Sequence, residues 1–114
     1  MILSKGEKVF VITRRGFEKD LRRHFVGEIL EVSAEAIKVR GYVFVFDEAT
    51  NDFECYEGLR TSIFSLIDAG IVIVVLPEEI IIEEIRYSYD EKNRRILTDG
   101  KAFSLNVSEF GRNR

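Results

Sequence analysis

The residues most capable of chemistry in this sequence are cations and aromatic rings on one predicted strand, residues 36–46. Successive side chains of a strand point to opposite sides, so one face is apolar and the other carries two cations followed by three rings. The second face consists of Lys38, Arg40, Tyr42, Phe44 and Phe46. Four arginines precede it in the chain, Arg14, Arg15, Arg22 and Arg23. Three neighbouring aromatic rings are energetically costly to expose to water, so we expect another molecule or another part of the chain to cover this face.

Three kinds of covering are compatible with this face. A second copy of the chain would bury the rings in a protein interface. A single-stranded nucleic acid would pair its phosphates with the cations and stack its bases on the rings. The chain itself would cover them with the turn around Phe17 or with residues 61–70. The formal net charge of −3 favours a second copy over nucleic acid, because nucleic-acid binders usually carry a basic excess.

No set of residues predicts catalysis or metal binding. His24, the only histidine, follows Arg23, and we expect it to be exposed or half covered on a strand. Cys55, the only cysteine, lies among carboxylates that blunt its thiol, so we interpret it as a small core residue. A zinc site needs about four Cys or His ligands, and Glu83 and Glu84 on a strand would point to opposite faces. We therefore predict no catalytic residue, metal, cofactor or small-molecule substrate.

Length and composition indicate one domain, residues 1–114. With 46% hydrophobic and 32% charged residues, the chain is typical of a globular domain with one core. The N-terminus turns polar by Ser4 and does not resemble a signal peptide. The longest apolar run, residues 71–76, is far shorter than the roughly 20 residues that cross a bilayer. One cysteine fits a reducing compartment, so we expect a cytoplasmic protein with no membrane partner.

Charge is unevenly distributed along the chain. Residues 41–91 carry two Lys or Arg against twelve Asp or Glu, whereas residues 1–40 and 92–114 are both net basic. Such separation could give one domain a basic end and an acidic end, which favours charge-complementary contact with a partner or with a second copy. If folding interleaves the acidic loops with the basic turns, the surface is instead of mixed charge.

The elements that position these residues are mostly short strands. Residues 61–70 are ambiguous, because their apolar spacing suits a short helix, which we prefer, or a strand Ile63–Ile67 followed by a turn at Asp68-Ala69-Gly70. Gly27 interrupts a strand that is apolar on both faces and predicts a bend there. Asp99-Gly100 predicts a two-residue hairpin turn. The predicted strands are Val9–Thr13, Phe25–Val32, Ala36–Phe46, Phe53–Glu57, a central strand 71–76 covered on both faces, a long strand Ile80–Tyr89, Arg95–Thr98 and 103–107.

Residues 6–47 resemble the start of the Sm-like (LSm) small β-barrel family. The matching features are the alternating first strand Val9-Phe10-Val11-Ile12, the second-strand pattern Phe25-Val26-Gly27-Glu28-Ile29 and the turn into Ala36-Ile37-Lys38-Val39. The resemblance implies an SH3-like barrel that closes into a ring by edge-strand pairing, often with RNA at the pore. At the family's RNA-reading aspartate and asparagine this chain has Ser33 and Lys38, and its Arg86 is followed by Tyr87 instead of glycine.

Together these observations predict a mainly β protein, a small SH3/Sm-like barrel with an additional C-terminal hairpin and one short helix. The predicted function is that of a non-catalytic, self-associating domain, with a ring as one form of the homo-oligomer. The alternative is a single-stranded nucleic-acid (RNA) binding module of Sm-like type. Both use the cations and rings named above as the binding surface.

Overall fold

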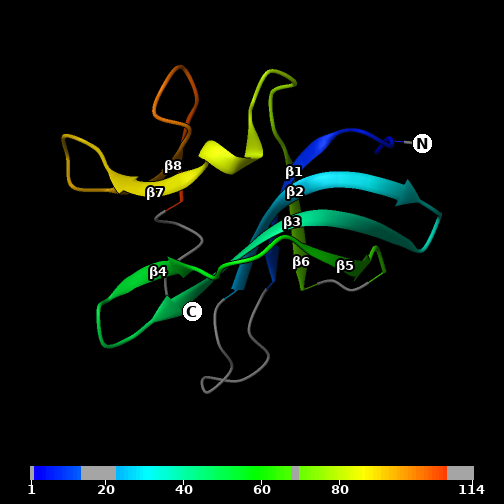
Figure 1. The fold of residues 1–114 in the computed structure, drawn as a ribbon, viewed down its shortest axis with the longest axis horizontal. Coiled ribbons are helices and arrows are strands. Elements are labelled where there is room, and N and C mark those ends of the chain that lie inside the picture. Colours follow the sequence, from blue (N-terminus) through cyan, green and yellow to red (C-terminus); the bar gives the residue numbers. More distant parts are fainter. Residues whose placement is uncertain (1, 14–22, 68–69, 108–114) are drawn as a thin grey trace.

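A computed structural model describes residues 2–13, 23–67 and 70–107, which form two antiparallel sheets (Figure 1). The prediction of a mainly β protein is confirmed, since the one helical element in this part of the chain is a single 3-10 turn. The elements are β1 (Lys8–Thr13), β2 (Arg23–Val32), β3 (Ala36–Asp47), β4 (Asp52–Cys55), β5 (Arg60–Ser65), β6 (Ile71–Val75), η1 (Ile82–Glu84), β7 (Arg86–Tyr89), β8 (Arg95–Thr98) and β9 (Ser104–Asn106).

The larger sheet has six strands in the order β4-β3-β2-β1-β6, with β5 also paired to β3. The 12-residue strand β3 holds two partners on one edge, because β5 pairs with Ala36–Gly41 and β4 pairs with Phe44–Asp47. At the other end of the sheet β6 pairs with β1. The chain therefore forms a curled sheet whose outermost strands are β4, β5 and β6.

The curl depends on two glycines that face each other across β2 and β3. Gly27 and Gly41 are register partners. A Cβ placed on Gly41 would lie 1.9 Å from the carbonyl oxygen of Val26, and one on Gly27 would lie 2.5 Å from that of Arg40. The two backbones approach too closely for any side chain, which is a recognised role of glycine within strands. Both strands bend strongly along their length (Figure 1).

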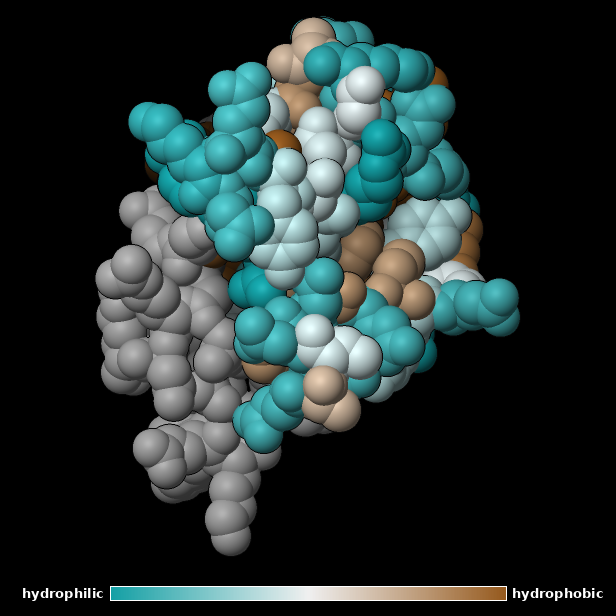
Figure 2. Space-filling view, turned by 90° about the vertical axis from the view of Figure 1, so that its left-hand side faces the viewer, coloured by the Kyte–Doolittle hydropathy of each residue, from teal (hydrophilic) through white to brown (hydrophobic). Residues whose placement is uncertain are grey.

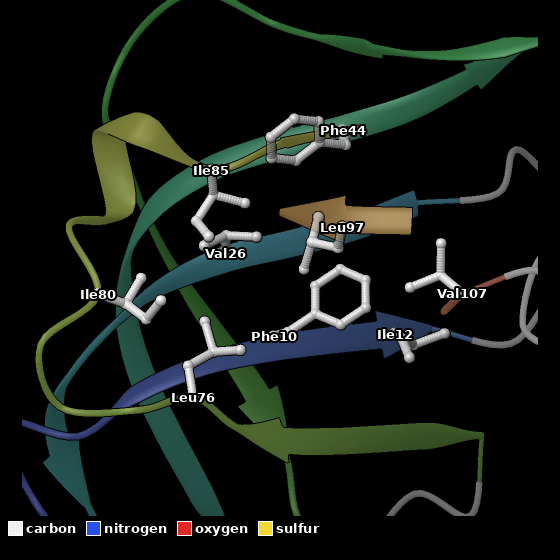
Figure 3. Close-up of a cluster of buried hydrophobic side chains, with 9 residues drawn as sticks. All are labelled: Phe10, Ile12, Val26, Phe44, Leu76, Ile80, Ile85, Leu97 and Val107. Atoms are coloured by element: carbon white, nitrogen blue, oxygen red, sulfur yellow. The ribbon is translucent and has the colours of Figure 1, made fainter. Parts of the chain in front are cut away.

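Strand alternation divides the core into two apolar clusters, one on each face of the larger sheet. The inner cluster lies within the curl and is built from Val9, Val11, Phe25, Ile29, Ile37, Val39, Val43 and Val45. The outer cluster joins Phe10, Val26 and Phe44 of the larger sheet to Leu97 and to the connection that follows β6 (Figure 3). Each fully buried side chain of this size stabilises the fold by about 1.5–3 kcal/mol. Each of the two apolar faces of the larger sheet must therefore be shielded from water, one by the curl of the sheet and the other by further segments of the chain.

The second covering is the small sheet β7-β8-β9, which we call the covering sheet. The predicted C-terminal hairpin is part of it, extended by a third strand. Asp90 builds its first turn by accepting hydrogen bonds from the amides of Lys92 and Arg94, and these bonds hold the pKa of Asp90 below its usual value. Asp99 builds the second turn, but the loop runs from 99 to 103, so the predicted two-residue turn is wrong.

Two predicted elements have a different secondary structure from the one expected. Residues 61–70 do not begin as a helix, because β5 occupies Arg60–Ser65 with Phe64 turned to the inner cluster and Ile63 turned outward. Pairing with β3 therefore overrode the helical spacing. The predicted strand Ile80–Tyr89 is also wrong, since η1 interrupts it and only Arg86–Tyr89 pairs.

Candidate interaction surfaces

The predicted aromatic face of β3 is covered by the chain itself. Phe44 is 4% exposed and Phe46 is 9% exposed, while Tyr42 is half buried and packs against the outer cluster. The Phe44 ring meets Tyr87 of the covering sheet edge to face at 5.3 Å between centroids. The expectation that these rings face outward is wrong. The covering sheet and the segment after β6 provide the second layer, and strand alternation alone cannot show which segment that will be.

A stack of three rings, His24, Phe53 and Tyr87, joins the covering sheet to β2 and β4. Nδ1 of His24 shares a hydrogen bond with the Tyr87 hydroxyl. Phe53 stacks on both rings, with its centroid 4.4 Å from that of His24 and 4.7 Å from that of Tyr87, and the His24 and Tyr87 centroids are 5.9 Å apart. His24 is only 2% exposed, so the expectation of an exposed or half-covered residue is wrong. Burial raises the pKa of Tyr87 far above its usual value, because the phenolate would lose its hydration.

Arg95 of β8 places its guanidinium group over the neighbouring rings of Phe46 and Phe53. Its guanidinium carbon lies 5.6 Å from the Phe46 ring centroid and 5.4 Å from that of Phe53. Its Nε is 3.6 Å from a carboxylate oxygen of Asp52, and its Nη2 donates a hydrogen bond to the Asn51 carbonyl at 2.8 Å. A cation–aromatic cluster therefore exists, but it is internal and fastens β8 to β3 and β4. On the side formed by β4, β7 and β8, the surface is mostly hydrophilic (Figure 2).

The three predicted cations that the structure describes, Arg23, Lys38 and Arg40, do not lie on one side of the sheet. Arg14, Arg15 and Arg22 lie outside the described residues. Arg23 is exposed on the inner-cluster side of β2, where its register partner is Val45. Lys38 and Arg40 point to the opposite side of the sheet.

Acidic residues accompany the cations on that outer side. The Nζ of Lys38 lies 3.7 Å from a Glu31 carboxylate oxygen, and Arg40 is the register partner of Glu28. The charge of this region is therefore mixed. Neither cation lies beside an exposed Phe44 or Phe46, so base stacking on these rings is not available in this arrangement.

β6 is an edge strand, although its apolar sequence predicted a central one. Its two faces do reach the core, since Ile73 packs on the inner cluster and Val74 on the outer cluster. Within the described residues its only ladder is with β1. The Leu76 amide donates to the Lys8 carbonyl at 2.8 Å, so Val72 and Val74 bond to β1 by alternation. The N–H and C=O groups of the odd-numbered residues of β6 consequently point to the open side.

β5 presents a second open edge, since in the part of the chain that the structure describes it pairs with β3 alone. The Leu66 amide donates to the Glu35 carbonyl at 2.7 Å, so the backbone groups of Thr61, Ile63 and Ser65 point away from β3. Large apolar side chains are exposed on or near both edges. They are Leu59, Ile63, Ile67, Val72 and Val75.

The two residues considered for catalysis, Cys55 and His24, have different surroundings in the structure. Cys55 is exposed at the end of β4, so its interpretation as a core residue is wrong, and partial burial raises the pKa of its thiol. His24 is engaged by Tyr87 and Phe53. In residues 2–13, 23–67 and 70–107 no three His, Cys, Asp or Glu side chains gather as metal ligands. Nor does this part of the chain contain a helix of the length and apolarity that a membrane span requires.

Comparison of the chain with known proteins identifies no relative. No family model matches the sequence, and no curated protein or solved structure matches it.

Proposed function

We propose that this chain is a non-catalytic domain that self-associates through its open strand edges, as a homo-oligomer in a reducing compartment such as the cytoplasm. The observation that carries the proposal is β6, which consists of five β-branched apolar residues and leaves one edge unpaired within the described structure. Edge strands are usually protected by charges, proline, bulges or extreme shortness, because a free edge is a template for another strand. Ile71–Val75 contains neither a charge nor a proline.

Backbone and side chains both support pairing at this edge. The outward N–H and C=O groups of Ile73 and Val75 would bond to an incoming strand, as in other cases of strand addition. Val72 and Val75 would lose their water contact at the same time, which adds an apolar contribution of about 25 cal/mol per Å² of apolar surface buried. The proposed interface is therefore apolar at its centre.

A second copy is the partner that this chain itself provides. Its β5 edge is open, carries the exposed Ile63, and has Arg60 as its only charged residue. Pairing of β6 with β5 of the next copy is head to tail and generates a ring or a filament, whereas pairing of β6 with β6 generates a two-fold dimer. The ring agrees with what the Sm-like resemblance implies. The copy number measured in solution distinguishes the two geometries.

Nucleic-acid binding has less support in this fold. It requires rings beside cations, and Phe44 and Phe46 are covered while Arg23 lies on the other side of the sheet from Lys38 and Arg40. Within the described residues, Tyr56 beside Arg60 and Tyr89 beside Arg95 are exposed rings near cations, but each is a single tyrosine and not a row of three rings on one strand. We therefore place the self-associating domain first.

Light scattering coupled to size exclusion tests the proposal. Val75→Lys adds a charge at an edge residue that is 49% exposed, and Ile81→Lys is a matched control that is 47% exposed but lies in the connection after β6. We expect wild type and Ile81→Lys to elute as the same oligomer and Val75→Lys to elute as a monomer. A wild-type monomer at tens of micromolar, or an unchanged oligomer in Val75→Lys, would contradict the proposal.

A further inference from the structure

The curl of the larger sheet leaves a pocket at one end of the inner cluster. The pocket lies between β1, β2, β3 and β5 and has a volume of about 140 Å³. Its floor is apolar and consists of Val11, Phe25, Val43 and Phe64. A cavity of roughly 150 Å³ lined by apolar side chains is large enough to hold benzene. The floor therefore has room for one compact apolar body.

The rim of the pocket carries two cations. Arg23 comes from β2 and Arg60 from β5, and both are exposed. Neither has a carboxylate within ion-pair distance in the described part of the chain, although Arg60 lies 5.7 Å from the Tyr56 ring centroid. The Thr13 hydroxyl donates to the Arg23 carbonyl at 3.0 Å, which ties β1 to β2 at the rim. Two cations beside an apolar floor leave a concentration of positive charge that an anion would neutralise.

We infer that this pocket binds a small organic carboxylate with a compact apolar body, the size of a single six-membered ring. The carboxylate would lie between the guanidinium groups, whose planar donors match its two oxygens. The body would displace water from the floor of Val11, Phe25, Val43 and Phe64. An inorganic anion can pair with the two arginines of the rim but has no apolar part to bury, whereas a neutral ring can fill the floor but cannot pair with the arginines. The site uses side chains on the inner-cluster side of the sheet, whereas the proposed self-association uses the outward backbone groups of the strand edges. The two share one strand, because Arg60 and Phe64 belong to β5.

The probe is benzoate, followed by ¹H–¹⁵N NMR of the full chain, with benzyl alcohol and inorganic phosphate as comparison ligands. We expect benzoate to shift the Val43 and Phe64 amides saturably. Benzyl alcohol and phosphate should bind at least tenfold more weakly, since benzyl alcohol has no negative charge and phosphate has no apolar ring. Arg23→Gln and Arg60→Gln should each weaken benzoate binding roughly tenfold, because hydrogen bonds to charged groups are among the strong ones.

The matched control is Arg40→Gln, which removes an exposed cation on the other side of the same sheet. Benzoate binding should be unchanged in this variant, and its amide spectrum should overlay that of wild type. The inference is overturned if benzoate causes no saturable shift at millimolar concentration. It is equally overturned if Arg40→Gln weakens binding as much as Arg60→Gln, since the anion would then sense only the overall charge.

Discussion

Tyr87 of β7 and His24 of β2 share a hydrogen bond between the tyrosine hydroxyl and Nδ1 of the imidazole, across the junction of the two sheets. Both rings stack on Phe53 of β4, so three separate strands meet around the buried His24. The bond gives each buried polar group a partner and fixes how the covering sheet lies on the larger one. The covering sheet held in this way buries Phe44 on the outer face of β3, so that this face is part of the core and not a binding surface.

Alkaline pH should weaken the fold through Tyr87. Its pKa is raised by burial, so the folded chain keeps the phenol proton at pH values where the unfolded chain has lost it. The contribution of Tyr87 is complete below the unfolded pKa of about 10 and is lost as pH rises above it, by up to about 1.4 kcal/mol per pH unit. Urea unfolding at a series of pH values between 8 and 11 measures the loss.

Tyr87→Phe should remove this pH dependence and, at pH 8, cost about 0.5–1.5 kcal/mol for the lost hydrogen bond. Tyr89→Phe changes an exposed ring of the same strand and is the matched control. Cys55 is present in all three proteins, so its own alkaline contribution cancels in the comparison. An identical pH slope in Tyr87→Phe and wild type would refute the assignment.

Gly41→Ala should be severely destabilising, because the new methyl group would lie 1.9 Å from the Val26 carbonyl oxygen. We expect a loss of at least 3 kcal/mol, at the upper end of what overpacking usually costs, roughly 1–3 kcal/mol. Gly58→Ala separates sterics from backbone strain, since its Cβ meets nothing within 4 Å although its φ is +100°. That variant should lose only about 1–2 kcal/mol. Similar losses in both variants, measured by urea unfolding, would show that the close approach at Gly41 is not decisive.

Arg95→Met should destabilise the fold more than Arg94→Met. Arg95 lies over the Phe46 and Phe53 rings and beside Asp52, whereas Arg94 forms an ion pair only with Asp90 in its own turn. We expect a loss of about 1–3 kcal/mol for Arg95, from cation–π and charged hydrogen bonds. The exposed pair of Arg94 and Asp90 should contribute less, because solvent screens it. Equal effects on the free energy of unfolding would contradict the internal role of Arg95.

A labelled single-stranded oligonucleotide should not bind by base stacking. Any binding would rest on phosphate contacts with exposed cations such as Arg40 and would fall steeply as salt increases. Fluorescence polarisation between low and physiological salt measures this. Tight binding that resists salt would indicate an aromatic platform and would favour the nucleic-acid alternative.

The sequence predicted the hairpin of β2 and β3 well, because its alternation determines which residues share a face. Val39 and Val43 lie in the inner cluster, and Phe44 lies on the opposite face, as predicted. Alternation states that a face is apolar but not which part of the chain covers it. The covering of Phe44 by Tyr87 depends on contacts between residues more than 40 positions apart, which no local pattern reveals.

The edge position of β6 was missed for a related reason. Apolar residues on both faces are typical of a central strand, and Ile73 and Val74 do pack on different clusters. The number of neighbouring strands is decided by sheet order, which places β6 beside β1 alone in the described residues. His24 was misjudged because the sequence cannot show that Tyr87 will meet it.

Amide hydrogen exchange at β6 tests the central proposal most directly. The Val74 amide, bonded to β1, should be protected in both wild type and Val75→Lys. The Ile73 amide, which points to the open edge, should be protected in the wild-type oligomer and exchange rapidly in the Val75→Lys monomer. Protection of the Ile63 amide in the same oligomer would identify β5 as the paired edge of the next copy, and its rapid exchange would identify β6. Rapid exchange of Ile73 in wild type at high concentration would contradict self-association through this strand.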